Sequence, residues 1–145
     1  DDVPLDWDRN EEFSGIVCLY RDLARLRLNR DGQTRGLCGR GVHVYRVDEE
    51  HKALAFRRWD EGAIRDDVVV VANLSHELLE HYKIGFPHAG AWRLRLNSDA
   101  GVYSPSFHDQ PAGDVEAELE DYDGFPAAAS VSVAPYSLLI FSQDE

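Results

Sequence analysis

Trp92-Arg93-Leu94-Arg95-Leu96, together with Val68-Val69-Val70-Val71, decides the fold class of this chain. In the first stretch apolar and charged residues alternate, which predicts a strand with one face in the core and one face in water. The second stretch is continuously apolar and β-branched, which is typical of a central strand buried on both faces. We therefore expect a sheet protein whose core includes Trp92.

Further strands are predicted on both sides of these two stretches. Residues 42–45 alternate, and after a polar turn residues 53–59 read as the returning strand of a hairpin. Alternation or apolar runs also predict strands at residues 82–86, 115–120, 131–133 and 136–141, of which 115–120 is expected to be exposed or at a sheet edge. Residues 97–111 and 121–129 are rich in turn residues and are predicted to be loops. The fold class is therefore mainly β, an antiparallel β-sandwich with Greek-key links and roughly seven or eight strands.

One α-helix is predicted before the strands. Its apolar residues recur at helical spacing, and they are Phe13, Ile16, Val17, Tyr20, Leu23 and Ala24. Asp8 and Glu11 have the spacing of a capping box, and Gly32 is available for the left-handed position after the helix. Leu19, Leu26 and Leu28 widen the apolar stripe, which indicates that the helix packs on more than one neighbour.

Composition excludes several classes of partner. The formal net charge is −12, which argues against nucleic acids and anionic membrane surfaces but does not penalise a neutral sugar polymer. No apolar run approaches the roughly 20 residues that span a bilayer, and no signal-peptide pattern is present. The chain contains no Met, even at position 1, so we expect it to be processed or to be part of something longer. Cys18 and Cys38 are expected to be reduced thiols in a cytoplasmic protein.

The motifs of catalysis and metal binding do not occur in the sequence. The six histidines show neither His-x-x-x-His spacing nor a neighbouring Cys-x-x-Cys, so neither a metal site nor a cofactor is predicted. Gly-x-Ser-x-Gly and the phosphate-binding glycine loops are absent, and no nucleophile stands beside a base. We predict no catalytic residue, and a complete small enzyme is the least favoured interpretation.

Two aromatic residues are candidates for carbohydrate binding, because sugars stack on flat rings. Trp59 shares a strand face with Ala55 and Arg57, so its ring is predicted to face solvent or to be covered by another domain. Tyr103 lies in the polar loop, where its ring could stack on a ligand.

Several segments follow one another in an order that matches a known family. They are Pro4-Leu5-Asp6-Trp7, the helix that carries Leu19-Tyr20-Arg21-Asp22-Leu23-Ala24-Arg25-Leu26-Arg27, residues 31–37, residues 55–60, residues 68–74, Ile84-Gly85-Phe86-Pro87, residues 92–99 and residues 134–142. In this order they resemble the C-terminal part of bacterial-type 1,4-alpha-glucan branching enzymes, which belong to the alpha-amylase superfamily. The likeness covers nearly the whole chain.

The resemblance implies two parts: residues 1–32 as the terminal helix of a missing catalytic barrel, and residues 33–145 as a C-terminal all-β domain. Members of this family transfer glucan chains by double displacement, with an Asp nucleophile and a Glu acid/base on loops of a (β/α)8 barrel. Such a barrel needs about 250 residues. Because the catalytic motifs have no matching positions here, no catalytic residue is carried over.

The leading hypothesis is a non-catalytic domain that stabilises the barrel of a cytoplasmic branching enzyme in glycogen biosynthesis and contacts alpha-glucan. Two alternatives are an autonomous alpha-glucan-binding module, with Trp59 and Tyr103 as platforms, and the C-terminal domain of another alpha-amylase-type glycoside hydrolase. In each case neither nucleic acid nor membrane is expected as a partner. Without the barrel, we expect an exposed apolar patch around Phe13, Val17 and Tyr20.

Overall fold

The computed structural model describes residue 4, residues 6–62 and residues 65–144. The helices are α1 (Arg9–Glu12), α2 (Ser14–Arg27) and the short 3-10 helix η1 (Arg35–Leu37). The strands are β1 (Gly41–Asp48), β2 (Ala53–Trp59), β3 (Val68–Asn73), β4 (Leu79–Phe86), β5 (Gly90–Asn97), β6 (Val115–Tyr122), β7 (Phe125–Val133) and β8 (Ser137–Ser142). This mainly β architecture, preceded by a helical region, confirms the predicted fold class.

The strands lie in the order β1-β2-β3-β8-β5-β6-β7-β4, and every pairing is antiparallel. Three pairings join strands that are distant in the chain, namely β3 with β8, β5 with β8 and β4 with β7, as Greek-key links do. β5 pairs with β6 through residues 90–92 and with β8 through residues 93–97, so this one strand belongs to both layers.

The main core lies between the two layers and is built on buried aromatic rings. Trp92 is fully buried, and its ring centroid lies 5.0 Å from that of Phe86. Phe86 in turn meets Phe141 edge-on at 5.9 Å. The indole N–H of Trp92 donates a hydrogen bond to the carbonyl oxygen of His88 at 2.9 Å, which satisfies its buried polar group. The sequence prediction that Trp92 belongs to the core is confirmed, and each such ring contributes about 1.5–3 kcal/mol by burial.

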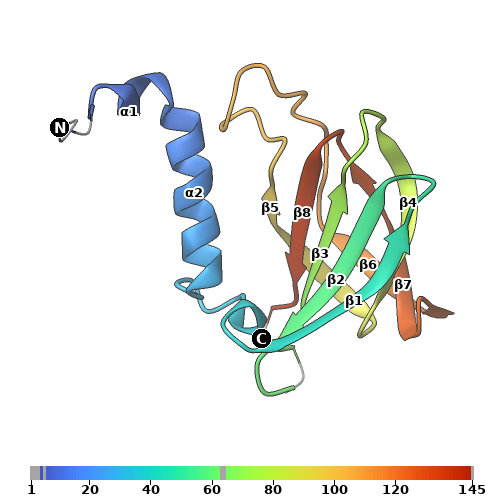
Figure 1. The fold of residues 1–145 in the computed structure, drawn as a ribbon. Coiled ribbons are helices and arrows are strands. Elements are labelled where there is room, and N and C mark those ends of the chain that lie inside the picture. The colour runs from blue at the N-terminus through green and yellow to red at the C-terminus, as the bar shows by residue number, and fades with distance from the viewer. Residues whose placement is uncertain (1–3, 5, 63–64, 145) are drawn as a thin grey trace.

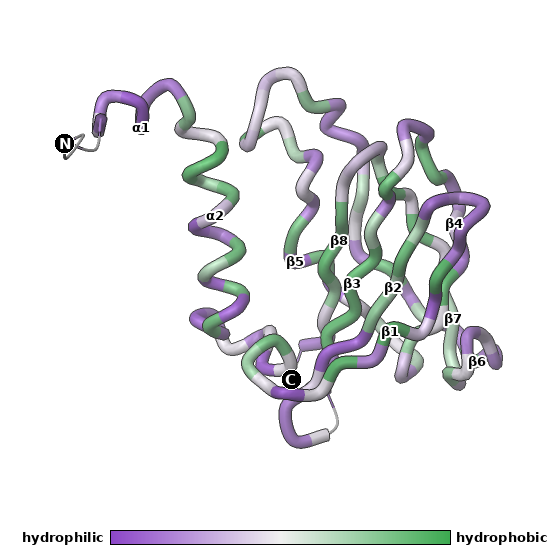
Figure 2. Tube along the Cα trace, in the orientation of Figure 1, coloured by the Kyte–Doolittle hydropathy of each residue, from purple (hydrophilic) through white to green (hydrophobic). Residues whose placement is uncertain are grey.

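A second, smaller core lies on the outer face of the β3–β8 layer, under α2. Val68, Val70, Leu96 and Ile140 point to this side, and Leu19, Leu23 and Leu26 of α2 pack against them. Val69 and Val71 belong to the main core instead, which confirms that residues 68–71 are buried on both faces. Figure 1 shows α2 beside the sheet, and Figure 2 shows hydrophobic residues recurring along α2, β3 and β8.

The ends of the helical region differ from the prediction. Asp8 itself has helical backbone angles and its side chain accepts no capping hydrogen bond, so the predicted capping box is wrong. The carboxylate of Asp6 takes that place and accepts a hydrogen bond from the N–H of Asp8 at 3.2 Å. After α2, the left-handed residue is Asn29 (φ 49°), because the N–H of Arg30 reaches back to the carbonyl oxygen of Arg25. Gly32 also has a positive φ, but it lies in the turn that follows.

Two strand predictions are corrected by the hairpin of β6 and β7. Residues 121–129 are not a loop, because β6 runs to Tyr122 and β7 begins at Phe125. Asp123 and Gly124 form the tight turn between them, with φ of 54° and 80°. β6 is not an edge strand either, although its exposed character is as predicted, and Leu119 is 82% exposed. Among the described residues, no helix has both the length and the apolar character needed to cross a membrane.

Candidate functional site

The outer face of α2 carries an apolar stripe that nothing in the described structure covers. Phe13, Ile16 and Tyr20 lie on this face at helical spacing, and all three are exposed, Tyr20 by 70%. Val17 beside them is half-buried. The predicted exposed patch is therefore confirmed at Phe13 and Tyr20. Large exposed apolar groups in such a row are typical of interaction surfaces, which bind proteins, membranes or ligands.

The connection between α2 and the sheet holds this stripe in a fixed direction. The hydroxyl of Thr34, a buried residue, donates to the carbonyl oxygen of Leu26 at 2.7 Å, and the N–H of Thr34 donates to the side chain of Asn29 at 2.8 Å. From the other side, the hydroxyl of Ser142 in β8 donates to the carbonyl oxygen of Gln33 at 2.5 Å. These bonds satisfy backbone groups at the end of the helix and join it to the central strand of the sheet.

Tyr103 joins the same helix to the loop of residues 98–114, which follows β5. Its hydroxyl donates to the carboxylate of Asp22 at 2.6 Å, and its side chain is only 9% exposed. Burial is the first cause, and the bond to Asp22 the second, of a raised pKa for Tyr103, so the phenol keeps its proton at neutral pH. Gly15 makes the approach possible, since a Cβ there would lie 1.8 Å from the carbonyl oxygen of Tyr103.

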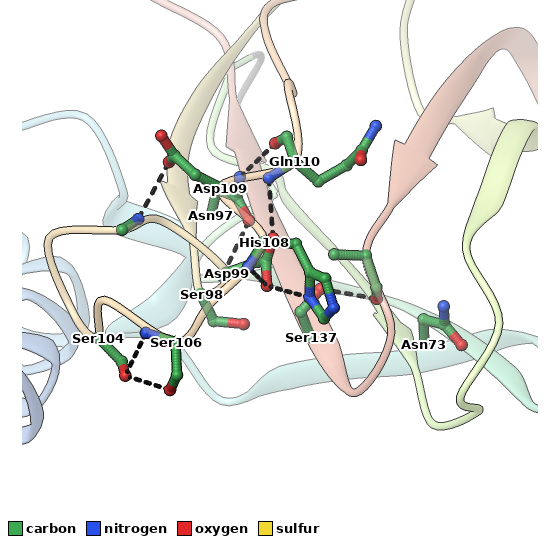
Figure 3. Close-up of polar contacts among 12 residues, drawn as sticks. Asn73, Asn97, Ser98, Asp99, Ser104, Ser106, His108, Asp109, Gln110 and Ser137 are labelled. Atoms are coloured by element: carbon green, nitrogen blue, oxygen red, sulfur yellow. Dashed lines mark hydrogen bonds and ion pairs between the residues drawn. The ribbon is translucent and has the colours of Figure 1, made fainter.

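Asp99 fixes the shape of this loop, as Figure 3 shows. Its buried carboxylate accepts hydrogen bonds from the N–H of Gln110 at 2.8 Å and from the N–H of His108 at 3.2 Å. Its own N–H donates to the side chain of Asn97 at 3.0 Å, and its carbonyl oxygen accepts from the N–H of Asp109 at 3.2 Å. A single buried side chain thus closes the loop on both sides of Tyr103, and sequence pattern alone gave no sign of it.

A groove of about 390 Å³ lies between the start of α2 and this loop. Its lining is mostly apolar, and the residues are Glu12, Phe13, Ser14, Gly15, Ile16, Val102, Tyr103, Ser104, Pro105 and Phe107. Phe13 and Phe107 are exposed, whereas Tyr103 is buried against Asp22. The groove therefore offers two accessible rings from two different elements.

Trp59 lies elsewhere, at the end of β2. Its half-buried ring rests on Gly41 of β1, where a Cβ would lie 2.2 Å from the indole. The guanidinium of Arg57 lies 4.7 Å from the centre of the ring, and the buried carboxylate of Asp67 pairs with Arg57. The β2–β3 loop after Trp59 and the loop that contains Tyr103 lie at opposite ends of the sandwich (Figure 1). The structure does not bring the two predicted sugar-stacking residues together.

Several titratable groups with shifted pKa values form a structural network where β1 meets β4. The hydroxyl of Tyr82 accepts from Arg46 at 2.7 Å and donates to Asp48 at 2.8 Å, while Arg46 also pairs with Asp123 at 2.8 Å. The backbone N–H of His51 and the phenol of Tyr82 lower the pKa of Asp48 to about 2, and burial raises the pKa of Tyr82 to about 12. Arg46, Asp48 and Asp123 each have a charged or hydrogen-bonding partner here, so the network closes the edge of the sandwich. Within the described ranges, no three His, Cys, Asp or Glu residues are grouped as a metal site requires.

Comparison with known proteins places these features in context. Residues 44–144 match the family model described as alpha amylase, C-terminal all-beta domain. The chain is 39% identical to the 1,4-alpha-glucan branching enzyme of Myxococcus xanthus (strain DK1622) over 150 residues, which covers 97% of this chain and 20% of the relative. It is 34% identical to the enzyme of the same name from Pseudomonas syringae pv. tomato, covering 97% of this chain and 19% of the relative. The chain thus spans about a fifth of the length of these curated relatives.

Proposed function

The chain belongs to the family of alpha amylase C-terminal all-beta domains, and from this premise we propose that it is the non-catalytic C-terminal domain of a 1,4-alpha-glucan branching enzyme. Its partner is the (β/α)8 barrel of the same enzyme, which carries the Asp and Glu residues that break and remake alpha-1,4 bonds. The domain stabilises that barrel in a cytoplasmic enzyme of glycogen biosynthesis. Residues 1–32 complete the barrel side of the interface, and residues 33–145 form the sandwich.

The exposed apolar stripe of α2 is the observation that carries this proposal. Phe13, Ile16 and Tyr20 expose hydrophobic surface whose burial against a barrel would stabilise the assembly by about 25 cal/mol for each Å² removed from water. The inner face of α2 is already packed on the sheet through Leu19, Leu23 and Leu26. One helix therefore holds the sandwich with one face and offers the other face to the barrel.

A fusion enzyme tests the proposal. Residues 1–145 replace the matching fifth of the Myxococcus xanthus enzyme, and branching of amylose is followed by the loss of its blue iodine complex. We expect an active fusion, and we expect Ile16→Asp to lower the yield of active enzyme because it buries an unpaired charge. Leu119→Asp on exposed β6 is the matched control and should leave the yield unchanged. A fusion that is folded and equally active with Ile16→Asp would refute docking through this stripe.

A second role, contact with alpha-glucan, is favoured by the groove between α2 and the loop of residues 98–114. Phe107 lies on the loop, outside the stripe that docks on the barrel, and its exposed ring suits a neutral sugar chain, while Tyr103 also lines the groove. Trp59 remains the alternative platform, with Arg57 beside its ring as a hydrogen-bond donor.

Affinity electrophoresis through gels with and without amylopectin measures this contact. Retardation that Phe107→Ala abolishes would assign the binding to the groove, and retardation that Trp59→Ala abolishes would assign it to the end of β2. Unchanged migration in the glucan gel would leave barrel support as the role of the domain.

A further inference from the structure

A polar pocket of about 550 Å³ lies where β5 begins and β8 ends. The segment before β3, the turn from β4 to β5 and the residues after β8 form its walls. Because β5 runs from here to the loop of residues 98–114, the pocket and that loop lie at opposite ends of the sandwich (Figure 1). The pocket is therefore separate from the groove beside Tyr103.

The charged side chains that line this pocket are mostly cationic, although the chain has a formal net charge of −12. Arg65, His88 and Arg93 line it together with one carboxylate, that of Asp144. Arg65 forms no ion pair with another residue that the structure describes. At physiological ionic strength charges are screened over about 8 Å, so these nearby cations outweigh the distant carboxylates.

The carboxylate of Asp144 is already neutralised. It accepts hydrogen bonds from Arg93 at 3.1 Å and from Arg95 at 2.5 Å. Arg93 also binds Asp114 at 3.0 Å, so these two arginines and two aspartates balance one another. Arg93 still has N–H groups that none of these bonds uses, because a guanidinium carries five. The excess positive charge at the pocket therefore comes from Arg65 and, when it is protonated, from His88.

His88 presents one ring nitrogen to the pocket. Its Nε2 lies 3.0 Å from the buried carboxylate of Asp67, which also pairs with Arg57. Since a carboxylate accepts hydrogen bonds, Nε2 is the donor, and Nδ1 is left for a ligand. Arg57 in turn lies 4.7 Å from the centre of the Trp59 ring. A chain of contacts thus joins the pocket to the alternative platform for sugar.

The backbone around the pocket adopts conformations that are unusual for the residues or need glycine. Arg65 has a φ of 69°, which is uncommon for a residue with a side chain, and Gly90 has a φ of 105°. Such conformations cost energy and are concentrated at binding sites. The side-chain amide of Gln143 donates to the carbonyl oxygens of Ala89 and Ala91 at 3.2 and 3.4 Å, which fixes the turn. Its side-chain oxygen remains an acceptor for a hydroxyl group.

We propose that this pocket binds the phosphate group of a sugar phosphate, either free or as an ester on an alpha-glucan chain. Arg65, Arg93 and doubly protonated His88 donate to the phosphate oxygens, for which guanidinium groups have matching geometry. Gln143 accepts from a sugar hydroxyl. The volume lies in the range of small-molecule sites, roughly 300–1,000 Å³. The choice of a sugar rests on the proposed function, whereas the recognition of phosphate rests on the pocket itself.

Amide chemical shifts in two-dimensional NMR test the site in residues 1–145. The chain is titrated with inorganic phosphate, with glucose 6-phosphate and with glucose. We expect the amides of Gly90 and Ala91 to shift with both phosphates, at lower concentration with glucose 6-phosphate, and not with glucose.

Three variants locate the binding. Arg65→Gln should weaken it about tenfold, because a hydrogen bond to a charged group is lost. Ala89→Asp, at an exposed residue of the turn, should abolish it by adding a carboxylate to the pocket. Arg21→Gln is the matched control, since it removes the same charge from an exposed position on α2 and should leave binding unchanged. Unshifted amides of the main core show that each variant is folded.

Affinity electrophoresis distinguishes the two sources of the phosphate group. Amylopectin is compared before and after chemical phosphorylation. Retardation by the phosphorylated polymer that Ala89→Asp abolishes would identify an ester on the glucan chain. Binding of glucose 6-phosphate without such retardation would identify the free sugar phosphate.

The proposal is overturned if neither phosphate gives a saturable shift, or if the shifts survive in both Arg65→Gln and Ala89→Asp. Either result leaves the proposed function standing, because branching by the fusion enzyme tests that function separately. An inactive fusion whose domain still binds glucose 6-phosphate would contradict the proposed function and leave the phosphate site in place.

Discussion

Tyr103→Phe removes the one side-chain hydrogen bond by which the loop after β5 holds α2 among the described residues. The lost group donates to a carboxylate at 2.6 Å, and hydrogen bonds to charged groups contribute about 1.5–3 kcal/mol. Tyr103 is buried, but Asp22 is only half-buried, so water can solvate the carboxylate once the phenol is gone. We therefore expect a loss near the lower limit, about 1.5 kcal/mol, or roughly a tenfold fall in the folding equilibrium constant.

Urea unfolding followed by circular dichroism measures this loss, and hydrogen exchange locates it. The amides of α2 should exchange faster in Tyr103→Phe, because the helix is released from the loop. Tyr20→Phe is the matched control, since it lies on the same helix, is 70% exposed, and its hydroxyl has no partner in the part of the chain that the structure describes. Its stability should stay within about 0.5 kcal/mol of the parent chain.

A double-mutant cycle with Asp22→Asn decides whether the two groups act as a pair. If they do, the double variant loses less than the sum of the single variants. The reasoning is refuted if Tyr103→Phe is as stable as Tyr20→Phe, or if the losses at Tyr103 and Asp22 simply add.

Three further variants, with Trp7→Ala as a control, test the packing and the edge network. The pKa of Asp48 is lowered from 3.8 to about 2, so its contribution to the free energy of unfolding is present above pH 3.8 and is lost as the pH falls toward 2. Asp48→Asn should therefore reduce the loss of stability at acid pH, measured by urea unfolding. An unchanged pH dependence would contradict this expectation. The pKa of Tyr82 is raised from 10.0 to about 12, so the folded state holds this proton more tightly and the free energy of unfolding falls as the pH rises from 10 to 12. Tyr82→Phe should reduce that fall. Stability that depends on alkaline pH as in the parent chain would count against this expectation. Trp92→Ala should lower the free energy of unfolding by about 3–5 kcal/mol, because it leaves a cavity in the main core. Trp7→Ala, at a residue that is 74% exposed, should lower it by less than about 0.5 kcal/mol. Similar losses from both variants would disprove the assignment of the core.

The fold class followed from local pattern, because alternation and β-branched runs report directly on burial. Val68–Val71 and Trp92 could be placed correctly for this reason. The hairpin of β6 and β7 was not predicted, because Phe125-Pro126 and the three alanines that follow do not alternate as a strand does. The Asp-Gly pair that forms its turn is a hairpin signal that could have been used. The pairing of β8 between β3 and β5 has no local signature, since it depends on contacts far apart in the chain.

The candidate site was less predictable than the fold. The apolar stripe of α2 was visible in the spacing of Phe13 and Tyr20, because helix geometry fixes which residues share a face. The partner of Tyr103 was not visible, since Asp22 lies 81 positions away and only the folded loop joins them. The sugar-stacking roles of Trp59 and Tyr103 stay predictions, and the contacts of both rings with Arg57, Gly41 and Asp22 give each of them a structural role as well.

The position of β8 has a consequence for biosynthesis. β8 is the last strand in chain order, yet it lies between β3 and β5 and contributes Leu139 and Phe141 to the main core. A nascent polypeptide that has emerged as far as β7 therefore still has two unpaired strand edges and an unfilled core. Folding of this domain must wait until residues 137–142 leave the ribosome, so a product that terminates early presents those edges to the quality-control machinery.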